Sequence, residues 1–288
     1  MTKPRPFNIR IFVAEGLPDG LRFVEKSNWI GLGIVCPRGR YPEVKKRAEF
    51  GNSGVYLLVG HEGDDDRPKI YIGEADSVRE RLDNHHAKKD FWQQTIVFTT
   101  KGDPLNKAQI QYIEARLVEL ATAAKRCRLD NGNIPKRPGL SEADEAQIEG
   151  YLEEMLSLLP VLGIHVFATA QTTSTSDRVY YWKGSGWNAT GYVTSTGFMV
   201  KAGSIARGAP VPSMEKHIPR DFQRRQQLIH DGILVVADNG YRFAIDYEFS
   251  SPSLAATICA GRSANGRTEW KDAKGITLKE HQEKEAQA

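Results

Sequence analysis

The order of the periodic segments between Gly51 and Lys125 most limits how this 288-residue chain can fold. Two β-rich runs are followed by a helical pattern, a third β-rich run and a long helical pattern, at residues 54–60, 69–73, 77–85, 92–100 and 107–125. The first two runs flank a polar, turn-rich segment, which predicts an antiparallel hairpin with a long loop. Ser77, followed three residues later by Glu80, predicts a capping box at the start of the first helix. The segment order therefore indicates an α+β unit.

Segments on both sides of this unit indicate a chain of several parts, as its length suggests. Residues 1–50 contain short β-rich runs, which predict a β-rich N-terminal extension. The central domain is expected to cover residues 51–170, including a further helix that begins after Ser141. A polar stretch at residues 171–178 is typical of an interdomain linker. Residues 179–288 show a second α+β pattern and are expected to form a C-terminal α+β domain.

The C-terminal segment carries two strong local signals. An Asn239-Gly240 pair between β-rich runs predicts a tight hairpin. Ser251 as N-cap, Pro252 at the first helical position and Gly261 at the end predict a short helix.

The composition narrows the class of protein without naming a function. Its 40% hydrophobic and 26% charged residues are typical of a globular chain. The formal net charge of +3 permits a polyanionic partner but is too small to identify one. The cysteines, Cys36, Cys127 and Cys259, are far apart and match neither a disulfide framework nor a zinc site. Because no signal-peptide pattern or membrane-length apolar run is present, we expect a cytoplasmic protein with no membrane partner.

Glu114 is the first candidate functional residue, because it lies within the apolar stripe of the second central helix. At about 100° per residue it falls beside Ile110, Leu117 and Ala121. A carboxylate in such a position costs free energy unless it is paired, hydrogen-bonded or bound to a cation. Glu114 is therefore expected either to hold a cation or to form a structural salt bridge, for example with Arg81.

Four further polar residues precede Glu114 in the same unit. Arg81 and His85 stand four positions apart on the first helix and therefore share a face. The hairpin adds Tyr56 on one strand and Tyr71 on the other. Each has an ordinary explanation alone: a solvated charge, a surface histidine, or a packing tyrosine whose hydroxyl reaches water. Their combination and their order along the chain are what indicate chemistry.

The set resembles the GIY-YIG nuclease family. The residues that carry the resemblance are Gly54-Val55-Tyr56, Tyr71-Ile72-Gly73, Arg81, His85 and Glu114. The first tripeptide has Val where the family has Ile, and the acidic segment HEGDDDRP between the tripeptides is longer than is typical. Its carboxylates would repel phosphate unless they point away or neutralise basic groups. The resemblance implies a GIY-YIG-type domain with a small antiparallel three-stranded sheet flanked by helices.

The resemblance also implies a divalent-metal-dependent endonuclease. Glu114 would bind one Mg²⁺ or Mn²⁺ ion, which would stabilise the leaving oxygen. Arg81 would stabilise the charge on the phosphate. Tyr56 or Tyr71, together with His85, would orient or deprotonate the attacking water, and the sequence does not decide between the two phenols.

Four residues are expected to support this site: Gly54, Lys69, Gly73 and Asn131. The two glycines belong to the tripeptides, and Lys69 shares a strand face with Tyr71. Asn131 falls where the family often has a supporting Asn, although Asn133 could equally fill that place.

The C-terminal segment is similar to an accessory domain of unknown function that recurs behind GIY-YIG units. Four stretches carry this resemblance: GFMVKAGS, RQQLIHDGIL, YEFSSPSLAA and GRSANGRTEWKDAKGITL. In the last stretch, cationic, polar and stacking groups suited to a nucleic-acid strand are Arg262, Asn265, Arg267, Trp270 and Lys271. The structural alternative, which we favour, is a hairpin at Asn265-Gly266 with Trp270 packed in the core.

The sequence thus predicts a nuclease whose partner is nucleic acid, with DNA as the expected substrate. A non-catalytic nucleic-acid-binding module on the same scaffold, or RNA as the substrate, is the alternative. A carboxylate kept in an apolar stripe argues against a pure binding module. A structural or partner-binding protein, in which the C-terminal domain does the main work, is a third hypothesis without a particular partner. A catalytic motif does not encode target choice.

Overall fold

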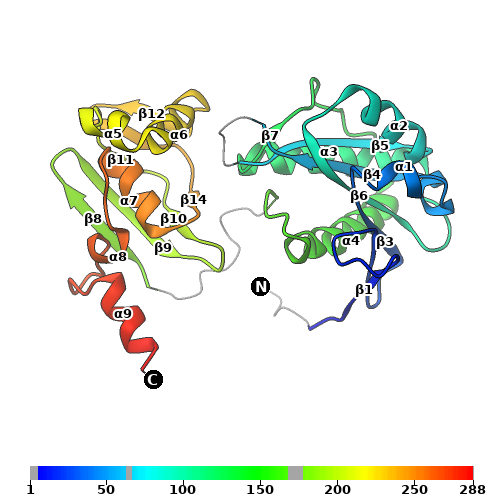
Figure 1. Ribbon diagram of the computed structural model, residues 1–288, viewed down its shortest axis with the longest axis horizontal. Coiled ribbons are helices and arrows are strands. Elements are labelled where there is room, and N and C mark those ends of the chain that lie inside the picture. Colours follow the sequence, from blue (N-terminus) through cyan, green and yellow to red (C-terminus); the bar gives the residue numbers. More distant parts are fainter. Residues whose placement is uncertain (1–5, 63–66, 168–177, 288) are drawn as a thin grey trace. The chain divides into compact units, whose positions relative to one another are not determined.

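The chain forms two compact units, Met1–Thr169 and Ala170–Ala288, in the computed structural model (Figure 1). The structure describes residues 6–62, 67–167 and 178–287. Each unit contains its own sheet, so the chain is a mixed α+β protein as predicted. Nearly all of the predicted linker lies outside the described residues. No helix in the described part of the chain is both long and apolar enough to span a bilayer.

A seven-stranded sheet forms the centre of the first unit. Its strands, in spatial order, are β1 (Ile9–Val13), β2 (Arg22–Lys26), β3 (Gly31–Pro37), β6 (Trp92–Thr100), β4 (Gly54–Gly60), β5 (Lys69–Ala75) and β7 (Arg128–Leu129). The predicted hairpin is confirmed, because β4 and β5 pair antiparallel with Tyr56 opposite Gly73. Only β7 runs parallel to its neighbour, and it covers β5 at Lys69 and Ile70 alone. The rest of β5 lies along an edge of the sheet.

The prediction of a three-stranded sheet is wrong, because the three expected strands are joined by four others. β3 pairs with β6 along its whole length, so the strands of residues 1–50 belong to the same sheet as the hairpin. β3 has the sequence GLGIVCP and is buried at every position before Pro37. Burial on both faces is typical of a central strand. Residues 1–50 are β-rich as predicted, and their strands continue the sheet that the hairpin forms.

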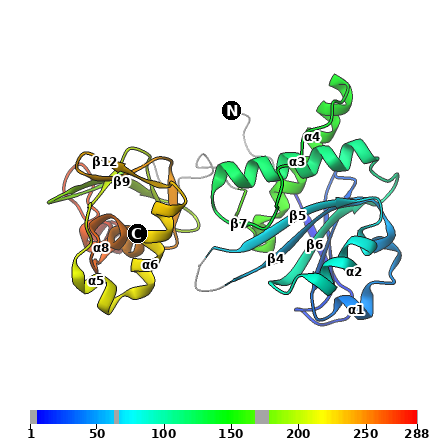
Figure 2. The same ribbon diagram turned by 90° about the horizontal axis from the view of Figure 1, so that it is seen from above.

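Helices cover both faces of this sheet (Figure 2). One face packs against α1 (Tyr41–Val44), the 3₁₀ turn η1 (Ala48–Gly51) and α2 (Val78–Lys88). The other face packs against α3 (Lys107–Ala124) and α4 (Glu142–Leu158), which is followed by the 3₁₀ turn η2 (Pro160–Leu162). The two faces have separate cores, and α2 and α3 reach the sheet from opposite sides.

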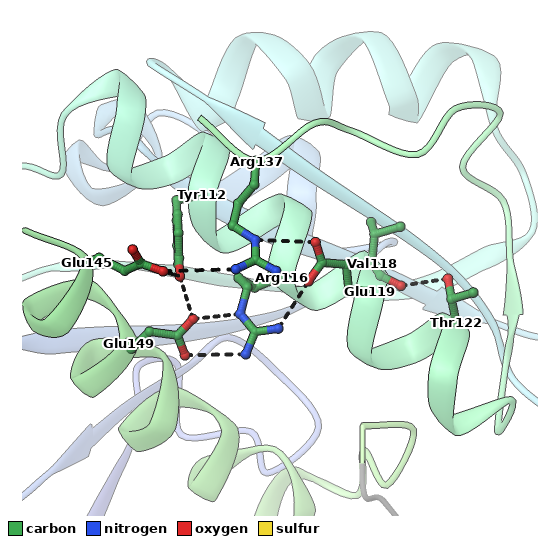
Figure 3. A network of polar contacts seen from close by, with 8 residues as sticks. All are labelled: Tyr112, Arg116, Val118, Glu119, Thr122, Arg137, Glu145 and Glu149. Carbon is green, nitrogen blue, oxygen red and sulfur yellow. Dashed lines mark hydrogen bonds and ion pairs between the residues drawn. The ribbon is translucent and has the colours of Figure 1, made fainter. Parts of the chain in front are cut away.

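A network of hydrogen bonds and ion pairs joins α4 to α3 (Figure 3). Glu149 of α4 accepts hydrogen bonds from the Tyr112 hydroxyl at 2.7 Å and from Arg116 Nε at 2.6 Å. Arg116 also pairs with Glu119, which in turn pairs with Arg137 of the following loop. The network attaches α4 to the helix that carries Glu114.

The starts of α2 and α3 differ from the predicted pattern. Ser77 is the N-cap of α2, but its side chain accepts no capping hydrogen bond, so the predicted capping box is wrong. A capping box forms instead at the start of α3, where Asn106 and Gln109 bond reciprocally to each other's backbone. This arrangement satisfies two of the N–H groups that a helix start leaves without partners.

The second unit also has a seven-stranded sheet. Its strands are β8 (Tyr180–Gly184), β9 (Trp187–Val193), β10 (Phe198–Val200), β11 (Ile205–Ala206), β12 (Leu234–Ala237), β13 (Gly240–Phe243) and β14 (Tyr247–Phe249). They follow the order β12-β13-β11-β9-β10-β14, and β8 pairs with β9. The helices of this unit are α5 (Pro212–His217), α6 (Pro219–His230), α7 (Pro252–Ala260), α8 (Gly266–Glu269) and α9 (Leu278–Glu285).

Both strong local signals of the second unit are confirmed. β12 and β13 form the hairpin, with Ala237 opposite Gly240. Ser251 caps α7 by accepting a hydrogen bond from the Leu254 N–H at 3.1 Å. Gly261 ends the helix in the left-handed conformation at φ +61°, which favours glycine.

The structural alternative for the segment around Trp270, a hairpin at Asn265-Gly266 with Trp270 in the core, is correct in one of its two parts. Trp270 is fully buried, and its indole N–H donates to the Pro252 carbonyl at 3.0 Å, so its place in the core is confirmed. The hairpin at Asn265-Gly266 is wrong, because Asn265 caps the short helix α8 by accepting from the Arg267 N–H.

Candidate functional site

Tyr56 and His85 meet beside the edge of the sheet. The Tyr56 hydroxyl lies 2.9 Å from His85 Nε2, and Tyr56 is only 1% exposed. β4 places Tyr56 on the face covered by α2, which carries His85. Gly73 makes this contact possible, because a Cβ atom there would overlap the Tyr56 hydroxyl. A glycine in a strand often marks such a close approach.

Tyr71 lies against the same histidine. The rings of Tyr71 and His85 are 4.7 Å apart, and those of Tyr71 and Tyr56 are 6.2 Å apart. The Lys89 ammonium lies 4.6 Å from the centre of the Tyr71 ring. Tyr71 is half-buried whereas Tyr56 is buried, so Tyr71 is the phenol that solvent reaches.

The pair formed by buried Tyr56 and half-buried His85 is uncharged near neutral pH. Burial, reinforced by Lys89 and Arg81, lowers the pKa of His85 to about 4. Burial likewise raises the pKa of Tyr56 above its usual range. A neutral imidazole has one nitrogen that donates and one that accepts, so a neutral phenol and a neutral imidazole can share one hydrogen bond.

Arg81 supplies positive charge to the same place. The charge of Arg81 lowers the pKa of Tyr56, of His85 and of Glu114, although in each case burial has the larger effect. The Arg81 side chain is exposed and forms no ion pair with any residue that the structure describes, Glu114 included. The structural salt bridge considered for Glu114 is therefore absent from the described residues, and the guanidinium is available to an anion.

Glu114 reaches this region from α3. Burial raises its pKa to about 7, and the nearby Glu74 carboxylate adds to the effect. A backbone hydrogen bond at Glu74, Lys107 and Arg81 act in the opposite direction. Lys107 is itself paired with Glu74 at 2.9 Å. Glu114 is therefore a half-buried carboxylate with no ion pair of its own in the described residues.

The donor set fits one hard divalent cation. Among the residues described, no group of three or more His, Cys, Asp or Glu side chains could hold a metal. A site built on Glu114 would leave the other positions to water and to a substrate phosphate. Mg²⁺ commonly keeps several waters and takes one or two carboxylates together with phosphate oxygens. A half-buried carboxylate without an ion pair has the oxygen chemistry that such an ion requires.

Two of the supporting residues, Asn131 and Gly54, have structural roles. Asn131 accepts a hydrogen bond from the Ile72 N–H at 3.0 Å and donates to the Ile72 carbonyl at 2.7 Å. These two bonds continue the edge of β5 where β7 ends, and they favour Asn131 over Asn133 as the supporting residue. A Cβ on Gly54 would overlap the Phe98 carbonyl oxygen of β6, so Gly54 allows the two strands to pair closely.

Lys69 belongs to an ion-pair network beside the site. Its ammonium pairs with Glu62 at 2.9 Å and with Asp130 at 3.0 Å. Lys89 pairs with the other oxygen of Asp130, and sequence reasoning missed both Lys89 and Asp130. Two signals could have found them: Lys89 directly follows the helix that carries His85, and Asp130 precedes Asn131.

The nucleic-acid residues proposed for the second unit are not equivalent. Trp270 is fully buried, so the prediction that a base stacks on it is wrong. Arg267 is exposed and bonds to Gln282, while the backbone of Lys271 pairs with Tyr181. Arg262 differs from them, because its guanidinium lies near two tryptophan rings.

Comparison with known families identifies part of the second unit. Residues 180–282 match a family described as a domain of unknown function (DUF4357), which fits the predicted C-terminal accessory domain. The match includes none of the candidate site in the first unit. Comparisons with curated proteins and with solved structures gave no match.

Proposed function

We propose that this chain is a divalent-metal-dependent endonuclease that hydrolyses phosphodiester bonds of DNA. The observation that carries the proposal is the position of Arg81. Its guanidinium, which forms no ion pair with a described residue, influences the phenol–imidazole pair of Tyr56 and His85 and the half-buried carboxylate of Glu114. A cation and a carboxylate that both have no ion pair among the described residues suit a polyanionic substrate that arrives with a metal ion.

Glu114 and Arg81 have complementary roles in this proposal. The Glu114 carboxylate would hold one Mg²⁺ or Mn²⁺ ion, which when bound supplies positive charge to the phosphate and to the leaving oxygen. Arg81 would donate hydrogen bonds to two phosphate oxygens, since a guanidinium matches them in a bidentate geometry. The charge of Arg81 would thus be held where negative charge develops on phosphorus.

The two phenols and the imidazole would orient the attacking water. Tyr71 is the accessible phenol, so we assign to it the contact with water. Tyr56 and neutral His85 support Tyr71 from the buried side through their 2.9 Å hydrogen bond and the ring contacts. Lys89, 4.6 Å from the centre of the Tyr71 ring, and Arg81 provide positive charge at this place.

Cleavage of supercoiled DNA in Mg²⁺, in Mn²⁺ and in EDTA tests the proposal. Glu114→Gln and Arg81→Gln should each reduce the rate about 100-fold or more, as expected when a group that stabilises the transition state is removed. Glu80→Gln is the matched control, because it removes an exposed carboxylate next to Arg81. Its rate should equal that of the parent.

Folding of the variants is checked by thermal unfolding. Since ionising Glu114 opposes its burial, metal-free Glu114→Gln should be at least as stable as the parent at pH 8. Cleavage that survives in both variants, or in EDTA, would contradict the mechanism. Binding of DNA without cleavage under any condition would favour a non-catalytic module, and cleavage of RNA alone would change the substrate.

A further inference from the structure

The second unit carries a compact group of two arginines and two tryptophans, Trp182, Trp187, Arg207 and Arg262, which we name the Trp187 cluster. The Trp187 ring lies 5.3 Å from the Trp182 ring at the end of the β8–β9 hairpin. The Arg262 guanidinium lies 5.8 Å from the Trp187 ring, and the Arg207 guanidinium lies 6.0 Å from it. Both distances fall within the range of cation–π interactions.

Backbone contacts hold the cluster in place. The Trp187 ring lies against Gly184, where any Cβ would overlap it, so the hairpin turn folds the indole back onto β8. Arg225, which is buried, donates hydrogen bonds to the carbonyls of Arg207 and Gly208. The Arg207 N–H donates to the Cys259 carbonyl at 2.8 Å. The backbone that carries Arg207 is thus anchored on both sides.

The cluster presents positive charge at a partly exposed place. Arg207 forms no ion pair within the described part of the chain. Arg262 has one ion-pair partner there, Glu269 at 3.5 Å, and also donates to the Ser263 carbonyl at 2.9 Å. A guanidinium near an aromatic ring keeps its N–H edge free for a phosphate, and the ring limits the freedom that binding would remove. The cluster therefore has the chemistry of an oxyanion contact.

The charge of the whole chain is concentrated in the same unit. Residues 178–288 contain fifteen Lys and Arg against eleven Asp and Glu, whereas residues 1–169 contain equal numbers of both kinds. Long-range attraction of a polyanion is thus a property of the second unit, since a balanced charge steers little.

We infer that the Trp187 cluster binds the phosphate backbone of nucleic acid and gives the second unit a substrate-holding role. The choice of nucleic acid among polyanions rests on the function proposed for the first unit. Arg207 and Arg262 each contact a phosphate, while Trp187 orients them.

Binding of oligonucleotides by the full chain in EDTA tests this inference, because no cleavage is then needed. The probes are a deoxythymidine oligomer of about 20 nucleotides and a duplex of the same length, measured by fluorescence anisotropy from about 50 to 200 mM salt. The variants are Arg207→Gln/Arg262→Gln and the charge-keeping Arg207→Lys/Arg262→Lys. The matched control is Lys274→Gln/Lys284→Gln, which removes two exposed charges outside the cluster.

The Gln pair should weaken binding about 10-fold and reduce the slope of log Kd against log salt by about 1.4 to 1.8, the value for two lost phosphate contacts. The Lys pair should keep most of the slope but bind more weakly than the parent, because an ammonium lacks the planar fork. The control should bind like the parent.

Three outcomes would overturn the inference: parent-like binding by the Gln pair, an equal loss in the control, or binding to vesicles containing phosphatidylserine but to neither oligonucleotide. Cleavage of supercoiled DNA by the parent in Mg²⁺ separates the two proposals. If the Gln pair loses binding in EDTA although the parent cleaves no DNA, the substrate-holding role stands and only the nuclease proposal fails.

Discussion

At the scale of single residues, His85 makes the stability of the first unit depend on pH. Its pKa is lowered to about 4 by burial and by Lys89 and Arg81, against an ordinary value of 6.5. A lowered pKa means that the folded protein resists protonation, so the stability it contributes is present above about pH 6.5 and is lost as pH falls through 4. Between these limits the loss should be about 1 to 2 kcal/mol, after allowance for partial exposure.

Comparison of the parent with His85→Gln isolates this effect. Chemical denaturation at pH 7, 6 and 5 should show a smaller loss of unfolding free energy in the variant than in the parent. Lys46→Gln, which removes an exposed charge that is not among the causes of the His85 pKa shift, should behave like the parent. Parallel pH profiles for the parent and His85→Gln would mean that His85 is already solvated in the folded protein.

Gly73 makes a second prediction at the same scale. A methyl group there would overlap the Tyr56 hydroxyl, so Gly73→Ala should displace the phenol from His85. We expect cleavage to fall about 100-fold while stability falls by about 1 to 3 kcal/mol. Gly150→Ala is the control, because a Cβ on that exposed residue of α4 meets nothing within 4 Å. An unchanged rate for Gly73→Ala would show that the position of Tyr56 does not matter for the reaction.

At the scale of elements, the sequence predicted many local features, such as strand bounds, but few of the pairings between strands that are far apart in the chain. The strands predicted at 54–60 and 92–100 are β4 and β6, with the same bounds. The pairing of β3 with β6 was not predicted, because it joins segments far apart in the chain and β3 has no alternation to show which face is inward. Ser77 has the residue type of a capping box, yet its side chain accepts no such bond.

The candidate site was predictable to the same degree. The residue types and their order along the chain were enough to choose Tyr56, His85 and Glu114 as candidates. The charge of Arg81 influences the pKa of all three. The ion pair of Lys89 with Asp130 was not predicted, because one residue follows a helix, the other lies in a loop, and nothing in the sequence shows that the fold brings them together. Helix periodicity placed Glu114 in an apolar stripe but could not exclude an ion pair with Arg81.

The attachment of α4 to α3 gives a prediction for elements. Arg116 pairs with both Glu149 and Glu119, so Arg116→Met should leave Glu149 without a cation, whereas Glu119 keeps Arg137. We expect a loss of about 1 kcal/mol, since the pairs are partly exposed, and faster hydrogen exchange in α4. Arg137→Gln, which removes a more exposed partner of Glu119, should have a smaller effect. Equal effects from both changes would indicate that Arg116 is not the centre of the network.

At the scale of the whole molecule, the two units have separate hydrophobic cores. The cores of the first unit are built on both faces of its sheet and include Leu117 of α3. The core of the second unit includes Trp270, which packs 4.6 Å from Phe198 and 6.0 Å from Trp182. No residue belongs to both sets among those described, so we expect each unit to have a stability of its own.

Paired core truncations should therefore affect one unit at a time. Leu117→Ala is expected to cost about 2 to 5 kcal/mol in the first unit, and Trp270→Ala about 3 to 5 kcal/mol in the second. Denaturation of the full chain, followed by hydrogen exchange in each unit, should show lower protection only in the unit that carries the change. Val236→Ala, at an 82% exposed position, serves as the control. If each truncation lowers protection equally in both units, they unfold as one cooperative body, because the loss of one core is then transmitted to the other.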